Sequence, residues 1–258
     1  MDAQVAIPLL PKNGAEAQPV SLVLDRRFWF AHAVWPGLAF ALFATVAAVT
    51  GLDEGLARSW AFDPVAHHFI GSGAGEWWAK NIIHSTGGRV VRILGGLLVL
   101  VLVFSFGIGS LKRWRRPASF VVLSVALGAG AVGVLKEVTN VDCPWSLAEF
   151  GGQQPYVQLF ADRPDSLPRA RCFPGGHSSS GFALFAVYFL WRGRNRRAAR
   201  WALGTAMLVG GVFSFGQEAR GAHFLSHDVW SAALLWFACL AVYAFIYRGN
   251  VWAGSRPG

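Results

Sequence analysis

The amino-acid sequence predicts an all-α fold, a bundle of six membrane-spanning helices, from three observations. Of its 258 residues, 54% are hydrophobic and only 14% are charged, whereas soluble domains carry about 25% charged residues. The apolar residues gather in six long stretches. Lysine and arginine are unevenly distributed among the segments that join these stretches. Together these observations favour an integral membrane protein over a large soluble core.

Each apolar stretch has about 16–24 residues, against the roughly 20 that a helix needs to cross the hydrocarbon core. The fourth and fifth stretches are short, so we expect tilted helices or helices that extend past the apolar residues. The six predicted spans are 28–51, 93–111, 118–135, 176–191, 201–217 and 229–247.

Two tails flank the membrane domain, which we place at residues 28–247. Residues 1–27 contain Pro8, Pro11 and Pro19 and have no long apolar run. We therefore interpret them as a flexible cytoplasmic tail and not as a cleaved signal peptide. A second cytoplasmic tail is predicted for residues 248–258.

The charge distribution predicts the orientation. With the N-terminus inside, the inner segments hold 14 of the 23 lysines and arginines but only 3 of the 14 acidic residues, and the outer segments hold 9 basic and 11 acidic residues. This is the positive-inside pattern, which places both termini in the cytoplasm. It explains the net charge of +9 without nucleic acid as a partner. We expect the inner membrane of a bacterium as the location.

Two further segments have a structural interpretation. Trp77 and Trp78, in "GEWWAKNIIHST", predict a short helix lying in the outer membrane interface. The run "GAGAVG" at 128–133 matches a dinucleotide-binding fingerprint, but no strand precedes it. Its small residues favour close packing of neighbouring helices instead.

Three polar clusters fall at the outer face in this topology, and ionisable residues there are functional candidates. The clusters are "LKEVTNVDCPW" at 135–145, "CFPGGHSSSGF" at 172–182 and "GQEARGAHFLSHDVW" at 216–230. In the first, Lys136 either binds phosphate as a point charge or extends to the interface as a snorkelling lysine. In the second, the N–H groups of Gly176 and His177 would lie in the first turn of a helix, where they favour binding of an anion. The alternative is an ordinary N-cap in which the histidine has no function.

The third cluster combines histidines with a carboxylate. A carboxylate beside a histidine fixes its tautomer and raises its basicity, and such a histidine can attack phosphorus. His223 and His227 are four residues apart, as zinc ligands on a helix can be, but Phe224 stands where the zinc signature needs glutamate. We therefore expect no metal and no other cofactor at an outer-face active site.

Taken in order, the clusters resemble the signature of the type 2 phosphatidic acid phosphatase superfamily. That signature reads Lys-x6-Arg-Pro, then Pro-Ser-Gly-His, then Ser-Arg-x5-His-x3-Asp, and this chain has "KEVTNVDCP", "PGGH" and "ARGAHFLSHD". The motifs cover residues 130–230. The resemblance implies a metal-free phosphatase that forms a phosphohistidine intermediate.

By this resemblance, five residues acquire roles. Lys136 would bind a phosphate oxygen and Gly176 would supply backbone N–H groups. His177 would protonate the leaving oxygen and later activate water. His223 would be the nucleophile, and Asp228 would orient it.

The chain also departs from the family pattern. Cys143 and Gln217 stand at the two arginine positions, and Gly175 stands at the serine position. The position four after His223 is His227, and Asp228 follows it, so either residue could orient the nucleophile.

Losing two arginines weakens phosphate binding unless other donors replace them, because a phosphoryl transition state spreads charge over three oxygens. Arg220, Arg169 and Arg171 are the candidate replacements. Cys143 and Cys172 share the outer loop between the third and fourth spans. They would form a disulfide if that side is oxidising, and would otherwise remain two separate thiols.

The sequence thus predicts a lipid phosphatase that hydrolyses a phosphomonoester or a pyrophosphate, because a site at headgroup level suits an amphiphile. Two alternatives stay open. One is a phosphotransferase that passes the phosphoryl group from the same histidine to a lipid acceptor. The other is a non-catalytic protein that binds or transports lipids.

Overall fold

The computed structural model describes residues 24–159 and 161–252. Most of the predicted N-terminal tail and the last part of the predicted C-terminal tail lie outside these residues. The parts that are described pack against the bundle. The first helix begins at Arg26, where the Asp25 side chain caps it by accepting a hydrogen bond from the Phe28 N–H. Near the other end, Val251 is buried and the Trp252 indole donates to the Leu190 carbonyl.

The described residues are mostly helical. The α-helices are α1 (Arg26–Trp29), α2 (Trp35–Thr50), α3 (Leu52–Leu56), α4 (Gly88–Phe104), α5 (Arg115–Thr139), α6 (Gly176–Phe182), α7 (Phe185–Arg192), α8 (Arg196–Ala219) and α9 (Leu225–Ala241). The π-helical segments are η1 (Phe30–Val34), η2 (Ala57–Ala61), η4 (Trp77–Gly87) and η8 (Val242–Ile246), and the 3₁₀ segments are η3 (Gly73–Gly75), η5 (Gly109–Trp114), η6 (Pro144–Ser146) and η7 (Ala148–Phe150). Strands β1 (Phe62–Asp63) and β2 (His68–Phe69) pair antiparallel.

Five helical stretches of the described chain are long and apolar enough to cross a membrane. They are Arg26–Thr50, Gly73–Phe104, Gly109–Ser146, Arg196–Ala219 and Leu225–Ile246. The first, third, fifth and sixth predicted spans overlap four of these stretches. Each stretch begins before the predicted span, and the third and fifth predicted spans are also exceeded at their C-terminal ends.

The second span differs from its prediction. Segment η4 continues directly into α4, so the expected separate interfacial helix is wrong, and the span ends at Phe104 and not at residue 111. Tertiary packing explains the continuity through two glycines. A Cβ on Gly87 would lie 2.8 Å from Phe213 Cε1, and a Cβ on Gly88 would lie 3.1 Å from His177 Cε1. Because these two glycines have no side chains, the rings of Phe213 and His177 can pack directly against the helix.

The fourth predicted span forms two shorter helices. A turn at Ala183 and Leu184 separates α6 from α7, and both helices pack along α8. Neither helix alone has the length of a membrane span. The count of six spans therefore remains a prediction.

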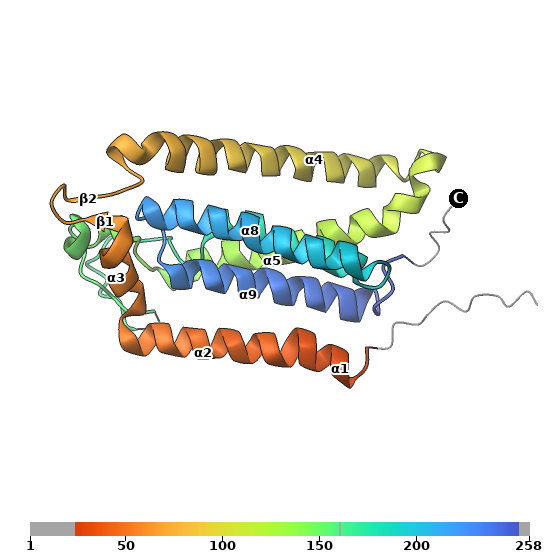
Figure 1. The fold of residues 1–258 in the computed structure, drawn as a ribbon, viewed down its shortest axis with the longest axis horizontal. Coiled ribbons are helices and arrows are strands. Elements are labelled where there is room, and N and C mark those ends of the chain that lie inside the picture. The colour runs from red at the N-terminus through yellow and green to blue at the C-terminus, as the bar shows by residue number, and fades with distance from the viewer. Residues whose placement is uncertain (1–23, 160, 253–258) are drawn as a thin grey trace, which may run out of the picture.

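The helices lie roughly parallel, with α2 and α4 at opposite edges and α5, α8 and α9 between them (Figure 1). The core is rich in aromatic residues from α5, α7 and η8, among them Phe120, Phe189 and Tyr243. Helix α2 buries none of its residues and exposes large apolar side chains such as Leu42. This apolar surface is suited to contact with lipid.

The two ends of the bundle differ in character. Helix α3 and strands β1 and β2 lie at one end, whereas α1 and the C-terminal end of α9 lie at the other (Figure 1). The C-terminal end of α5 and the N-terminal ends of α6 and α9 lie at the end that carries α3, which we call the loop end. All three polar clusters of the sequence therefore meet there.

Candidate active site

The first polar cluster is held by hydrogen bonds to the segment before α6. Lys136, in the last turn of α5, donates from Nζ to the Arg171 carbonyl at 3.0 Å. Thr139 Oγ1 donates to the Phe173 carbonyl at 2.9 Å. Asn140 ends α5 with a φ of 51°, in the left-handed region that asparagine tolerates. These bonds fix Lys136 beside the second cluster.

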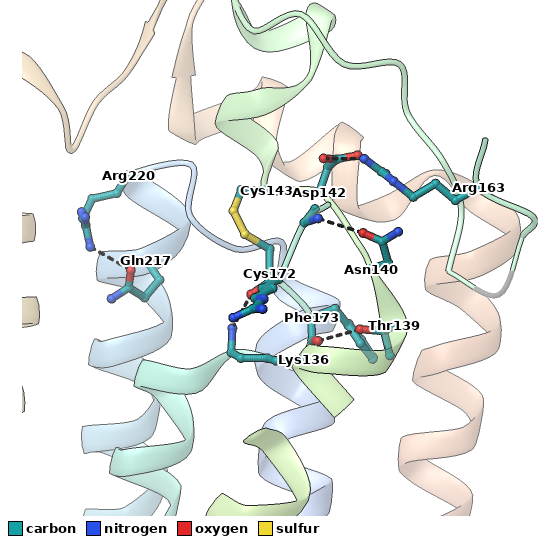
Figure 2. The surroundings of a disulfide bond; sticks show 12 residues. Lys136, Thr139, Asn140, Asp142, Cys143, Arg163, Cys172, Phe173, Gln217 and Arg220 are labelled. Carbon is teal, nitrogen blue, oxygen red and sulfur yellow. Dashed lines mark hydrogen bonds and ion pairs between the residues drawn. A yellow bond between two sulfur atoms is a disulfide. The ribbon is translucent and has the colours of Figure 1, made fainter. Parts of the chain in front are cut away.

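A disulfide reinforces the same connection. The structure joins Cys143 to Cys172, with their Cα atoms 5.2 Å apart (Figure 2), a normal separation for a disulfide. The Cys172 N–H also donates to the Val141 carbonyl. At the start of α6, a Cβ on Gly176 would lie 3.0 Å from Lys136 Cε. The glycine thus lets the lysine reach the start of α6.

The start of α6 packs tightly against the start of α9. The Gly175 N–H donates to the His227 carbonyl at 2.9 Å, and Ser178 Oγ donates to Asp228 Oδ1 at 2.6 Å. A Cβ on Gly175 would lie 2.1 Å from Asp228 Oδ1. The packing therefore requires glycine where the family pattern has serine, and Ser178 supplies the nearby hydroxyl.

The third cluster places three buried polar side chains together. His223, His227 and Asp228 are buried, and the two imidazole rings are 5.7 Å apart between centroids. Within the described residues, no hydrogen-bond partner reaches Nδ1 of either histidine or Oδ2 of Asp228. Leaving a buried polar group unpaired costs about 1–3 kcal/mol, so such groups point to a functional site.

Burial also sets the protonation state of His223. Its pKa lies well below the usual value, mainly because of burial and then because of the nearby charges of His227 and Lys136. His223 is therefore a neutral imidazole at neutral pH, which is the form in which it can act as a nucleophile. Among the described residues, no hydrogen bond joins it to Asp228, so the choice of Asp228 or His227 as orienting residue stays a prediction.

His177 is clamped between two rings. The His84 ring lies 4.4 Å from it and the Phe213 ring 4.5 Å, both between centroids. His177 Nε2 lies 3.3 Å from the Ile83 carbonyl, which can only accept, so Nε2 carries the proton in this contact. The second polar cluster is thus joined to the helix formed by η4 and α4.

His84, which was not among the predicted site residues, also lies at this site. Its Nδ1 lies 2.7 Å from Gln217 Nε2, and Gln217 Oε1 accepts a hydrogen bond from Arg220 at 2.9 Å. Arg92 lies one turn beyond Gly88, on the same helix, and its charge acts on both His84 and His177. The polar run "HSTGGR" within an otherwise apolar helix was the available signal.

The three candidate replacement arginines have different surroundings. Arg171 forms an ion pair with Glu137 at 3.0 Å, and Arg169 approaches the same carboxylate at 3.7 Å. Both side chains are about 60% exposed. Arg220 is instead bonded to Gln217 and lies over the Trp145 ring, with its Cζ 5.9 Å from the centroid. Arg220 is thus the candidate that forms a partly buried hydrogen bond with a residue of the third cluster (Figure 2).

Among the residues that the structure describes, no group of three or more histidine, cysteine, aspartate or glutamate side chains is arranged to hold a metal ion.

The family model of the PAP2 superfamily matches residues 117–250 of the chain. The chain belongs to the PAP2 superfamily. No curated protein and no solved structure matches it. The matched segment contains Lys136, His177 and His223, whereas His84 and Arg92 lie before it. Membership in the PAP2 superfamily supports a phosphatase-type function, and the apolar helices fit an integral membrane protein.

Proposed function

We propose that this PAP2 protein is a membrane phosphatase that hydrolyses the phosphomonoester or pyrophosphate group of a lipid. One observation carries the proposal: the buried, neutral His223 lies within electrostatic reach of Lys136 and His177 at one end of an apolar helical bundle. This arrangement offers a nucleophile, a fixed positive charge and a second group for proton transfer.

The proposed reaction has two steps. In the first, a nitrogen of His223 attacks phosphorus, the bond from phosphorus to the leaving oxygen breaks, and protonated His177 gives its proton to that oxygen. In the second, water attacks the phosphohistidine, gives a proton to His177, and the phosphorus–nitrogen bond breaks. Phosphate leaves and both histidines return to their starting states. General acid–base help of this kind contributes about 10²–10⁴-fold.

Positive charge and N–H donors would stabilise the transition state. Lys136, the backbone N–H groups at Gly176 and the Arg220 guanidinium are the donors we assign to the phosphate oxygens. Arg169 and Arg171 would contribute only if they exchange Glu137 for phosphate. Asp228 or His227 would hold His223 in its reactive orientation.

Cavities support an amphiphilic substrate. A cavity of about 500 Å³ lies between α2, α5 and α9 and is lined almost wholly by apolar side chains. A smaller cavity of about 80 Å³ at the loop end is lined by His227 and Asp53. Ala44 and Trp230 line both. An acyl chain in the larger cavity would therefore have its headgroup near His227.

The topology is part of the proposal. With α6 and α7 together as the fourth span, the chain crosses six times, and the positive-inside pattern places the loop end outside and both termini in the cytoplasm. In a bacterial inner membrane the site would face the periplasm. A reporter fused at the C-terminus should behave as cytoplasmic, and an extracytoplasmic signal would overturn the outer-face site.

The direct test is hydrolysis by purified protein in lipid nanodiscs. Phosphatidic acid, phosphatidylglycerol phosphate, a polyprenyl pyrophosphate and phosphorylated lipid A form the substrate panel, with free glycerol phosphate as the soluble comparison. We expect inorganic phosphate from at least one lipid without added acceptor, in the presence of EDTA, and none from the His223→Ala protein.

Each other result has a defined meaning. Phosphate release only when a lipid acceptor is added would identify a phosphotransferase. Loss with EDTA and recovery with zinc or magnesium would overturn the metal-free mechanism. Binding of the lipids without any phosphoryl transfer would identify a non-catalytic lipid-binding protein.

A further inference from the structure

The hydrogen bonds around His84 define a second arm of the site, outside the segment that matches the family. Arg220 is always a donor, so the oxygen of the Gln217 amide must face it and the amide nitrogen must face His84. The amide N–H then donates to His84 Nδ1. A neutral imidazole that accepts at Nδ1 carries its proton on Nε2. The network therefore leaves His84 with an N–H donor at Nε2. Among the described residues, no hydrogen bond is formed by this N–H group.

The surroundings of His84 favour an anion. The positive charges of Arg220, Arg92 and Lys80 act on its ring. Lys80 is paired with Glu76, but the ion pairs of the described residues include no carboxylate partner for Arg92 or Arg220. The Glu76 carboxylate acts on Arg220 from a distance but forms its ion pair with Lys80, so two cations and an N–H donor lie near His84 without a carboxylate in direct contact.

The position of His84 relative to the reacting groups is equally specific. Its ring lies against that of His177, the residue assigned to the leaving oxygen, with 4.4 Å between centroids. The glycine at 88 lets the η4–α4 helix approach His177 this closely. A phosphate group within reach of His177 is therefore within reach of His84 as well.

The geometry points to His84 as a phosphate-binding residue that replaces, through Gln217 and Arg220, the arginine absent from position 217. In this arrangement His84 Nε2–H donates to a phosphate oxygen. Gln217 fixes the tautomer, and Arg220 fixes the amide of Gln217. Arg92 adds positive charge from the same helix as His84. The assignment rests on the proposed phosphatase function, which supplies the phosphate group.

The test compares two substitutions at one position. The His84→Phe substitution keeps a flat ring and removes both nitrogens, so we expect about 10–100-fold weaker binding of orthovanadate, the loss expected for one hydrogen bond to a charged group. A glutamine side chain places its amide N–H near the position of Nε2, so His84→Gln should recover at least half of this loss on a logarithmic scale. Binding is measured by calorimetry in detergent, and kcat/KM on the lipid should follow it. His68→Phe, at an exposed histidine of β2, is the matched control and should match wild type.

A double substitution tests the replacement itself. If His84 and Gln217 stand in for the family arginine, Gln217→Arg should raise vanadate affinity in the His84→Ala background and lower it in the wild-type background, where the new guanidinium meets His84. Equal effects in both backgrounds would refute the replacement. Vanadate affinity of His84→Phe within twofold of wild type, with an unchanged thermal midpoint, would refute the assignment of His84.

The two levels of the proposal fail differently. A wild-type protein that hydrolyses lipids and whose affinity for vanadate is independent of His84 would refute this arm and leave the function in place. A protein that binds vanadate through His84 but hydrolyses no lipid in the panel would refute the function and leave the arm in place. Lower thermal stability of His84→Phe together with full rescue of stability, but not of affinity, by His84→Gln would assign the residue a structural role only.

Discussion

The two ends of the bundle each bury a histidine, and the two histidines differ in how their nitrogens are bonded. At the end that carries α1, His32 Nδ1 bonds the Phe28 carbonyl at 2.8 Å, and Nε2 meets the Tyr188 hydroxyl at 2.7 Å and the Arg192 Nε–H at 3.0 Å. At the loop end, Nδ1 of His223 has no partner among the described residues.

This difference separates a structural histidine from a reactive one. His32 ties three parts of the chain together, because its backbone carbonyl also accepts a hydrogen bond from the Trp236 indole. Every polar atom of its side chain is used. His223 is hydrogen-bonded to the backbone of Cys172, but its Nδ1 is buried without a partner among the described residues, as expected where a substrate completes the bonding. Burial of a histidine is therefore less informative than the number of its nitrogens left unpaired.

The largest expected effect comes from His223→Ala. Loss of the nucleophile should lower kcat by at least about 10³-fold, with little change in the thermal midpoint, because the removed imidazole has an unpaired nitrogen. Rapid quench with a labelled activated substrate should find no phosphohistidine. Label on His223 in the His177→Ala protein, which lacks the base that activates water against the phosphohistidine, is the matched positive control. Label on His227 would instead identify His227 as the nucleophile.

The next effect concerns the disulfide at the loop end. The bridge between Cys143 and Cys172 closes a loop with a sequence separation of 29, so its loss should cost about 3–4 kcal/mol in the chain-entropy model. Cys143→Ser with Cys172→Ser should lower the thermal midpoint under oxidising conditions, and a reductant should lower that of the wild type alike. Mass spectrometry without reduction should find this bridge and a free Cys239. Two alkylatable thiols at 143 and 172 in unreduced protein would contradict the expectation.

A smaller effect is expected at the opposite end. His32→Ala removes a bonded side chain within the membrane, where one interhelical hydrogen bond is worth about 1–2 kcal/mol. The thermal midpoint should fall, while kcat/KM per folded molecule stays within about twofold of wild type. A loss of turnover comparable with that of His223→Ala, at unchanged stability, would show that the comparison between the two ends is wrong.

The smallest expected effect is a shift of the pH profile. Because burial lowers the pKa of His223 below 6.5, the nucleophile stays neutral, and activity should persist, as the pH falls through 6.5. The acidic limb of kcat/KM, corrected for ionisation of the substrate, should lie below that value. Lys136→Gln removes one of the charges that lower this pKa, so the limb should move to higher pH in that variant. A wild-type limb above 6.5 would contradict the assigned state of His223.

Much of the fold follows from the apolar stretches, and part of the site does too. The helices over 118–135 and 229–247 were predictable because their apolar runs are uninterrupted, and alternating direction then brings Lys136 and His223 to one end. The break between α6 and α7 was not predictable, since Ala183 and Leu184 carry no turn signal. Nor was the continuity of η4 with α4.

His84 shows the physical reason for what the sequence conceals. Its partners Gln217 and His177 lie 133 and 93 positions away in the chain, and two glycines allow the contact by lacking side chains. A residue whose role depends on such packing has no local motif. In the sequence, Gln217 was notable only because it stands where the family pattern has arginine. The role of its amide follows from its hydrogen bonds to His84 and Arg220, which only the fold brings together.

Gly175 has a consequence for transferring the family's serine into this chain. A serine at this position, as the family pattern has, would drive its Cβ to within 2.1 Å of Asp228 Oδ1. A single substitution back to the family residue would therefore displace the Asp228 carboxylate from Ser178. The family's serine would therefore fit at position 175 only together with a change that makes room at 178 or 228. The residue at 175 is thus coupled to the Ser178–Asp228 pair and cannot be exchanged for the family residue by itself.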